Sequence, residues 1–171
     1  LKTQRGEHGE GPWPMNFVSF GDYKMPGLIY ILAPFIKIFG LNNFAVRFPN
    51  AVFGSLAVVF SYLLLTKIFP KRKKIAFWSS LFLALAPYHI HASRMVYEPQ
   101  VAFVWQLLGV LTLVSAKRNF LKLFSLPFFL MAMFTYNSPL FLILPLCIII
   151  LYFFKKDFFN KKTRKSTVFF L

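Results

Sequence analysis

The sequence holds few acidic residues and a single cysteine. Five Asp and Glu residues stand against 20 Lys and Arg residues, for a formal net charge of +15. Cys147 has no second cysteine among the 171 residues, which excludes a disulfide within them, and its apolar neighbours indicate a buried, unreactive side chain. No charged segment leads into a short apolar stretch with a small-residue cleavage site, so we expect no signal peptide in these residues.

The apolar content is too high for a soluble domain of this size. Hydrophobic residues make up 57% of the chain and aromatic residues 20%. In water this composition would leave apolar surface uncovered, whereas lipid would cover it. We therefore expect an all-α, polytopic bundle of transmembrane helices. Because the chain starts at Leu1 and ends in an apolar run, we expect a fragment of a longer protein in which 167–171 begins a further span.

The apolar runs predict one short helix and five spanning helices. Residues 1–43 are expected to form an external loop. The run 27–39 within it predicts an interfacial helix, because crossing the hydrocarbon takes about 20 residues. The longer runs do not alternate polar and apolar residues as membrane β-strands do. They predict transmembrane helices over about 44–69, 75–91, 99–116, 120–136 and 139–154.

The basic residues fit the pattern that orients membrane proteins. If the helix over 44–69 runs inward, the loops near 67–74, 117–122 and 155–165 are cytoplasmic, and they hold most of the Lys and Arg residues. Four of the five acidic residues fall on the opposite side: Glu7, Glu10, Asp22 and Glu98. Membrane orientation therefore accounts for the net charge, and we expect membrane lipid and no nucleic acid as a partner.

Ionisable groups suited to chemistry gather on the expected external face. The predicted spans have no Asp, Glu, Lys or Arg near their middles, where transporters and proton relays keep them. Moving a sugar from a lipid phosphate needs a carboxylate to take the acceptor proton and cations to hold the departing phosphate. The candidates are the carboxylates of Asp22 and Glu98 and the cations Lys24, Arg47 and Arg94.

Simpler explanations exist for several of these residues. Lys24 and Arg47 can extend to lipid headgroups. His89 and His91 fit a solvated loop pair, and their i, i+2 spacing is not that of helical metal ligands. One carboxylate among basic residues does not indicate a divalent cation site, so we expect no cofactor and assign no metal ligands, and the use of a divalent metal stays open. The tyrosines of this face fit an aromatic belt: Tyr88, Tyr97 and Tyr136.

Three segments resemble motifs of a known family. Residues 19–26, Ser-Phe-Gly-Asp-Tyr-Lys-Met-Pro, resemble the first external loop of bacterial glycosyltransferases of the dolichyl-phosphate-mannose protein mannosyltransferase superfamily, although Met25 replaces the first proline of the usual Lys-Pro-Pro. Residues 39–49 resemble its Phe-Gly…Arg-Leu-Pro element. Residues 86–98 are similar to its second external loop, Pro-x-His…Ser-Arg…Glu. The superfamily has the GT-C fold and includes the lipid A aminoarabinose transferases.

The resemblance implies an inverting glycosyltransferase in the bacterial plasma membrane. The donor would be a polyprenyl-phosphate-linked sugar, and the unidentified acceptor would lie outside the cytoplasm. By analogy Lys24 would contact the donor phosphate and Glu98 would be a catalytic acidic residue. The family's main catalytic carboxylate lies upstream of the matching stretch, so the fragment is expected to be inactive alone. The further substrate-binding candidates are Asp22, Arg47, His89 and Arg94.

Two other functions stay open on the sequence. The chain could belong to a transporter or flippase, although the absence of charge in the middle of the predicted spans disfavours this reading. It could also belong to a membrane protein without catalytic activity, which composition does not exclude.

Overall fold

The described part of the chain is helical apart from one short hairpin. The computed structural model describes residues 17–19, 22–116 and 119–137 and the single positions 141, 145 and 148. Strands β1 (Phe17–Ser19) and β2 (Asp22–Lys24) pair antiparallel, with Phe17 opposite Lys24. The prediction of an all-α membrane-type bundle is confirmed, and the hairpin is a small addition that the sequence did not indicate.

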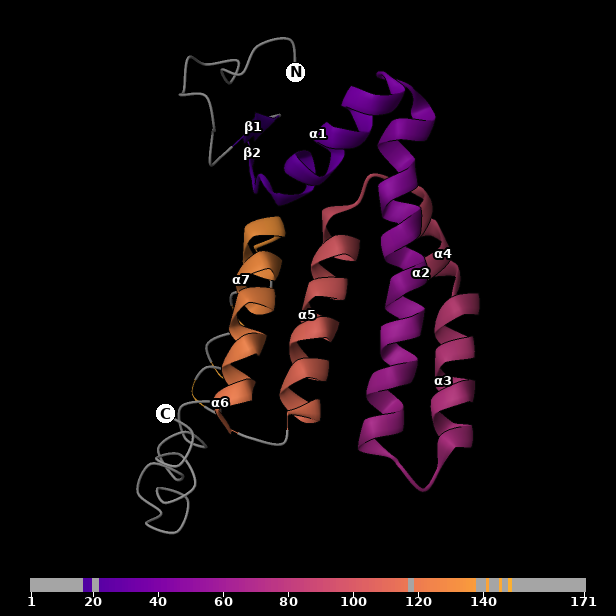
Figure 1. The fold of residues 1–171 in the computed structure, drawn as a ribbon. Coiled ribbons are helices and arrows are strands. Elements are labelled where there is room, and N and C mark those ends of the chain that lie inside the picture. Colours follow the sequence, from indigo (N-terminus) through magenta and orange to yellow (C-terminus); the bar gives the residue numbers. More distant parts are fainter. Residues whose placement is uncertain are drawn as a thin grey trace.

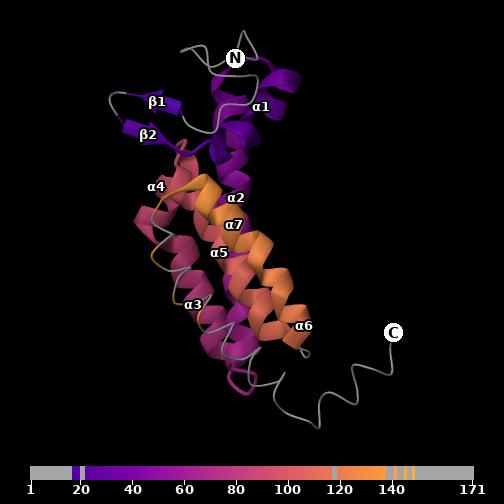
Figure 2. The ribbon, with the colours of Figure 1, turned by 90° about the vertical axis from the view of Figure 1, so that its left-hand side faces the viewer.

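The bundle is made of helices that lie side by side, namely α2 (Asn43–Ile68), α3 (Lys73–Leu85), α5 (Glu98–Ser115) and α7 (Leu126–Thr135), and α1 (Gly27–Phe39) crosses one end of it (Figure 1). Helix α2 packs against α3, α4 and α5, and α5 packs against α7. Helix α1 and the hairpin lie together at the crossed end (Figure 2). The helices are α1 (Gly27–Phe39), α2 (Asn43–Ile68), α3 (Lys73–Leu85), α4 (Pro87–Arg94), α5 (Glu98–Ser115), α6 (Asn119–Lys122), a 3-10 turn (Leu123–Ser125) and α7 (Leu126–Thr135).

The corner between α1 and α2 is built by two residues. Gly40 ends α1 with φ at 75°, a backbone conformation that favours glycine. The Asn42 side chain then caps α2 by accepting a hydrogen bond from the Ala45 amide at 2.7 Å, and it donates back to the Phe39 carbonyl at 2.8 Å. These bonds fix the turn that lays α1 across the end of the bundle.

Helix α1 occupies the residues over which the sequence predicts an interfacial helix. Leu28 and Leu32, one turn apart, bury their side chains against Val101 at the start of α5. Phe53 and Trp105 pack around this cluster. Helix α1 therefore covers one end of the bundle, and its place at a membrane surface stays a prediction.

The segment expected as one helix over 75–91 is two helices. Helix α3 ends at Leu85 and α4 begins at Pro87, with Ala86 extended between them at φ −62° and ψ 124°. A proline has no amide hydrogen and disfavours helical geometry in the residue before it, so the break falls at Ala86. The single-helix prediction was wrong here because the apolar run continues past the break.

Two of the described helices are long and apolar enough to cross a membrane. They are α2, with 26 residues and a hydropathy of 1.9, and α5, with 18 residues and a hydropathy of 1.2. The shorter α3 and α7 run beside them (Figure 1). The predicted spans over 139–154 and 167–171 lie outside the described residues, apart from the three single positions. The number of membrane crossings stays a prediction.

Small side chains fill the helix contacts, and large apolar ones face outward. Outward-facing side chains include Trp78, Phe82 and Leu130, which are 54%, 70% and 62% exposed. Small residues let helices approach closely in lipid, where apolar surface needs no shelter from water. This arrangement is expected of a bundle surrounded by lipid. The buried alanines are Ala45, Ala57, Ala76, Ala92, Ala102 and Ala132.

Helices α2 and α4 approach each other closely at Gly54. A Cβ atom added to Gly54 would lie 2.6 Å from the Ser93 Cβ and closer still to its hydroxyl. Any larger residue at position 54 must therefore push the two helices apart.

We predict that Gly54→Ala destabilises the protein by about 1–3 kcal/mol, because the added methyl group overpacks this contact. Thermal unfolding of the full-length protein in detergent measures the loss. Ser93→Gly removes the atoms that the new methyl meets, so it should cost less stability in the Gly54→Ala protein than in the wild type. Equal costs in the two backgrounds would contradict the close approach.

Candidate functional site

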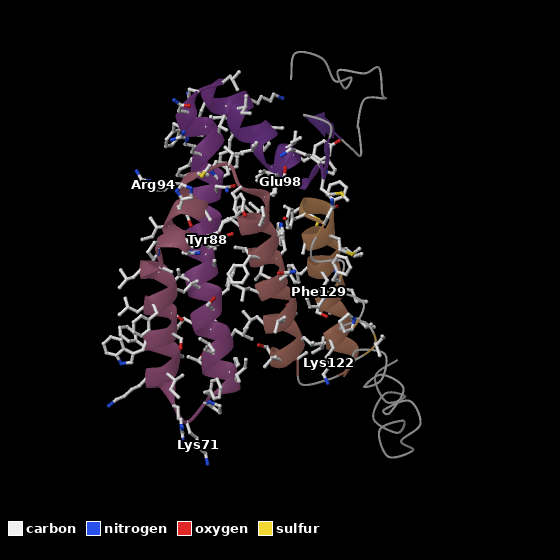
Figure 3. All side chains as sticks on the ribbon, turned by 180° about the vertical axis from the view of Figure 1, so that it is seen from behind. Lys71, Tyr88, Arg94, Glu98, Lys122 and Phe129 are labelled. Atoms are coloured by element: carbon white, nitrogen blue, oxygen red, sulfur yellow. The ribbon has the colours of Figure 1, made fainter. Side chains whose placement is uncertain are left out.

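Charged side chains lie at the two ends of the bundle. Figure 3 shows Lys71 and Lys122 at one end and Arg94 and Glu98 toward the other. We call these the Lys71 end and the Glu98 end. Helix α1, the hairpin, α4 and the start of α5 all belong to the Glu98 end (Figure 1).

The structure brings the predicted cations to the Glu98 end. Lys24 ends β2, Arg47 lies in the first turns of α2, and Arg94 ends α4, and all three side chains are exposed. Glu98 is half-buried at the first position of α5, where the helix N-terminus favours a negative charge. Asp22 belongs to the same hairpin, and its side chain lies outside what the structure describes.

A tyrosine pair stands next to Glu98. The Tyr88 and Tyr97 hydroxyl oxygens are 3.2 Å apart, and their rings meet edge to face with centroids 6.5 Å apart. The hydrogen bond to Tyr88 is the largest cause that raises the pKa of the Tyr97 hydroxyl, followed by the charge of Tyr88, burial and the charge of Tyr136. The raised pKa keeps the Tyr97 hydroxyl protonated at physiological pH, so it can donate a hydrogen bond.

His89 is buried rather than solvated. It lies on α4, only 7% exposed, with Nε2 at 3.1 Å from the Gly54 carbonyl and Nδ1 at 3.5 Å from the Gln100 side-chain nitrogen. A carbonyl oxygen only accepts, so Nε2 carries the proton and Nδ1 accepts from the Gln100 amide. The expectation of a solvated pair is wrong for His89, and its geometry indicates a structural role. His91 is exposed.

Two buried amides complete a network around the Tyr97 carbonyl. Asn50 on α2 donates to this oxygen at 3.1 Å, and the Gln100 backbone amide donates to it at 3.2 Å. The Gln100 side chain reaches His89, and His89 reaches Gly54, one turn from Asn50 on α2. We call Asn50, Tyr97, Gln100, His89 and Gly54 the amide network.

Burying the Asn50 side chain costs folding stability, because one of its two polar atoms is left without a partner among the described residues. Its side chain is fully buried, and its Oδ1 atom has no hydrogen-bond partner among the described residues. A buried unsatisfied polar group costs about 1–3 kcal/mol, whereas one hydrogen bond contributes a net 0.5–1.5 kcal/mol, about the same or less. Stability alone therefore does not explain an asparagine at this position.

Sequence reasoning missed the amide network and the tyrosine pair. Asn50 and Gln100 are amides inside apolar runs, and such groups need partners when they leave water. The sequence could therefore have predicted that Asn50 and Gln100 form hydrogen bonds inside the bundle. It could not have predicted their partners, which depend on how the helices pack. Among the residues that the structure describes, no three His, Cys, Asp or Glu side chains gather where they could share a metal ion.

The chain matches a known protein family over most of its length. The model of the family described as dolichyl-phosphate-mannose-protein mannosyltransferase matches residues 13–136, so the chain belongs to this family. Membership implies a membrane glycosyltransferase that uses a polyprenyl-phosphate-linked sugar. No curated protein and no solved structure matches the chain significantly. The matched region contains Lys24, Arg47 and Glu98.

We predict that Tyr88→Phe lowers the pKa of Tyr97 toward its ordinary value of 10.0, because the hydroxyl that holds the Tyr97 proton is lost. Ultraviolet titration of the full-length protein in detergent, with Tyr97→Phe identifying the signal, measures the shift. Since the folded pKa is raised, the contact stabilises the fold below pH about 10, and this contribution is lost as the pH rises through the pKa of Tyr97.

Tyr62→Phe is the matched control, because Tyr62 is an exposed tyrosine on α2. The Tyr62→Phe protein should show the same pKa for Tyr97 as the wild type. A Tyr97 midpoint that is the same in the wild type and in Tyr88→Phe would show that the two hydroxyls do not interact.

Proposed function

We propose that this family member transfers a sugar from a polyprenyl-phosphate donor to an acceptor outside the cytoplasm, with the chemistry at the Glu98 end. The supporting observation is that β2, the start of α2 and the start of α5 lie at the end of the bundle opposite the turn between α2 and α3 (Figure 1). These elements carry Lys24, Arg47 and Glu98. A donor of this kind has a charged head at the membrane surface and a tail in lipid. A site at the rim of the bundle suits both parts.

The roles follow from the charges that change during transfer. Acting beside the main catalytic carboxylate that the family resemblance places upstream, the Glu98 carboxylate takes the proton of the acceptor hydroxyl as the acceptor oxygen bonds to the anomeric carbon. The bond from that carbon to the phosphate oxygen breaks, and the electron pair leaves with the polyprenyl phosphate. Lys24 and Arg47 hold the resulting negative charge. Attack opposite the departing phosphate in one step inverts the anomeric carbon.

The pair of Tyr88 and Tyr97 fits beside these groups. Tyr97 directly precedes Glu98, and its hydroxyl and that of Tyr88 can donate to sugar or phosphate oxygens. Aromatic rings with a polar tip suit the boundary between lipid and water. Tyr88 is 70% exposed and open to a ligand.

Charge gives the proposed orientation. The turn between α2 and α3, together with the helix ends beside it, carries five exposed basic side chains, which the positive-inside rule assigns to the cytoplasm. The Glu98 end would then face the outside of a bacterial plasma membrane, in a multi-pass protein. These five are Lys67 at the end of α2, Lys71 and Arg72 in the turn, and Lys73 and Lys74 at the start of α3.

We predict that Lys24→Ala raises the KM for the donor about 10- to 100-fold, the loss expected from one charge-assisted hydrogen bond. Glu98→Gln should lower turnover by about 100-fold or more, because the general base is gone. Transfer or release of label from tritiated mannosyl-phosphoryl-polyprenol by the full-length protein measures both.

Lys73→Ala is the control for a lost positive charge, because Lys73 is an exposed lysine at the Lys71 end. It should leave both constants unchanged. Equal effects of Lys24→Ala and Lys73→Ala would remove the donor assignment. Wild-type turnover of a well-expressed Glu98→Gln protein would remove Glu98 from the chemistry.

A further inference from the structure

The short link between α4 and α5 leads directly into Glu98, the carboxylate of the proposed chemistry. Helix α4 ends at Arg94 and α5 begins at Glu98, so three residues separate the helices. A carboxylate that takes a proton must hold its place to within about 0.5 Å. The contacts that hold this link in place therefore affect the position of the Glu98 carboxylate during the reaction.

We infer that Asn50, together with Gln100 and His89, positions the Tyr97–Glu98 peptide and through it the Glu98 carboxylate. This inference rests on the proposed function. Asn50 is a positioning residue in this scheme, because it acts on Glu98 through the Tyr97 carbonyl and needs no contact with the substrate.

The amide network fixes the link from two neighbouring helices. The Tyr97 carbonyl accepts one hydrogen bond from Asn50 on α2 and another from the Gln100 backbone on α5. From Gln100 the path continues to His89 on α4 and returns to α2 at Gly54. Because Asn50 and Gly54 lie one turn apart, α2 holds both ends of the path. The peptide before Glu98 therefore cannot shift without breaking bonds to the packed helices.

The burial of the network adds to its rigidity. Asn50, His89 and Gln100 are 0%, 7% and 5% exposed, so water does not compete for their hydrogen bonds. On the other side of the link, the Tyr97 hydroxyl meets that of Tyr88 on α4. The link is thus held through both the backbone and the side chain of Tyr97.

The unsatisfied oxygen of Asn50 favours positioning over stability. An apolar residue of the same size would leave no unpaired oxygen in the interior, but it would also leave the Tyr97 carbonyl without its bond to α2. The asparagine lowers folding stability but keeps the hydrogen bond to the Tyr97 carbonyl. A residue that lowers stability in this way is expected where the geometry of its contact serves the reaction.

The first test measures the motion of the link and does not depend on activity. In the full-length protein with Cys147→Ala, a spin label is attached at Val96→Cys, an exposed position in the link. Asn50→Leu keeps the side-chain volume and removes the donor to Tyr97. We expect a more mobile spectrum in Asn50→Leu and an unchanged spectrum in Ser80→Ala, which loses a buried hydroxyl on α3 that has no partner among the described residues.

The second test separates positioning from binding. With tritiated mannosyl-phosphoryl-polyprenol, Asn50→Leu should lower kcat by up to about 100-fold, because a misplaced catalytic group slows the reaction. The KM for the donor should stay within about twofold, since the phosphate contacts proposed for Lys24 and Arg47 remain. Ser80→Ala should change neither constant.

Each outcome decides one of the two claims. An unchanged label spectrum in folded Asn50→Leu overturns the positioning role, whatever the activity of the wild type. A mobile label with unchanged kcat also overturns it. A wild-type protein that transfers no sugar from any lipid-linked donor overturns the proposed function, while the label still reports on the network. If Asn50→Leu does not fold, Gln100→Met opens the same network at His89, and an unchanged label spectrum there overturns the inference.

Discussion

The arrangement of this protein depends on the cost of placing charge in hydrocarbon. An Asp, Lys or Arg side chain at the centre of a spanning helix costs about 2.5–3.5 kcal/mol on insertion scales. Helix α2 accordingly carries Arg47 near its start and Lys67 near its end, with no charged residue between them. Helix α5 carries Glu98 in its first turn and no other charge. Separating the charges into two ends creates the one end where a carboxylate and several cations meet.

Three of the buried polar residues form one hydrogen-bonded system near Glu98. Many large apolar side chains of the described residues face outward, and small residues such as alanine and glycine lie in several helix contacts. Asn50, His89 and Gln100 nevertheless lie inside, and they converge on the peptide before Glu98. Helix α1 covers the same end through Leu28 and Leu32. The polar interior and the covering helix together make the Glu98 end the most constrained part of the bundle.

The lengths of the apolar runs match α1, α2 and α5 to within a residue or so at each end, whereas they carry no information about contacts between helices. The run 27–39 coincides with α1 because Gly27 and Gly40 bound it in the sequence. The run over 75–91 hid the break at Ala86, because its apolar character continues while Pro87 changes the backbone. His89 was read as solvated because its neighbours in sequence are polar, whereas its surroundings come from α2 and α5. The family resemblance selected Lys24, Arg47 and Glu98, and local patterns alone did not distinguish them from other charges at a membrane rim.

The central claim is that the Lys71 end and the Glu98 end face opposite sides of a membrane. In the full-length protein with Cys147→Ala, Arg72→Cys and Arg94→Cys each place one thiol at an exposed position of one end. A membrane-impermeant maleimide applied to intact cells should label position 94 at once and position 72 only after the membrane is permeabilised. Labelling of both positions from outside, or of position 72 alone, would contradict the orientation on which the proposed sugar transfer rests.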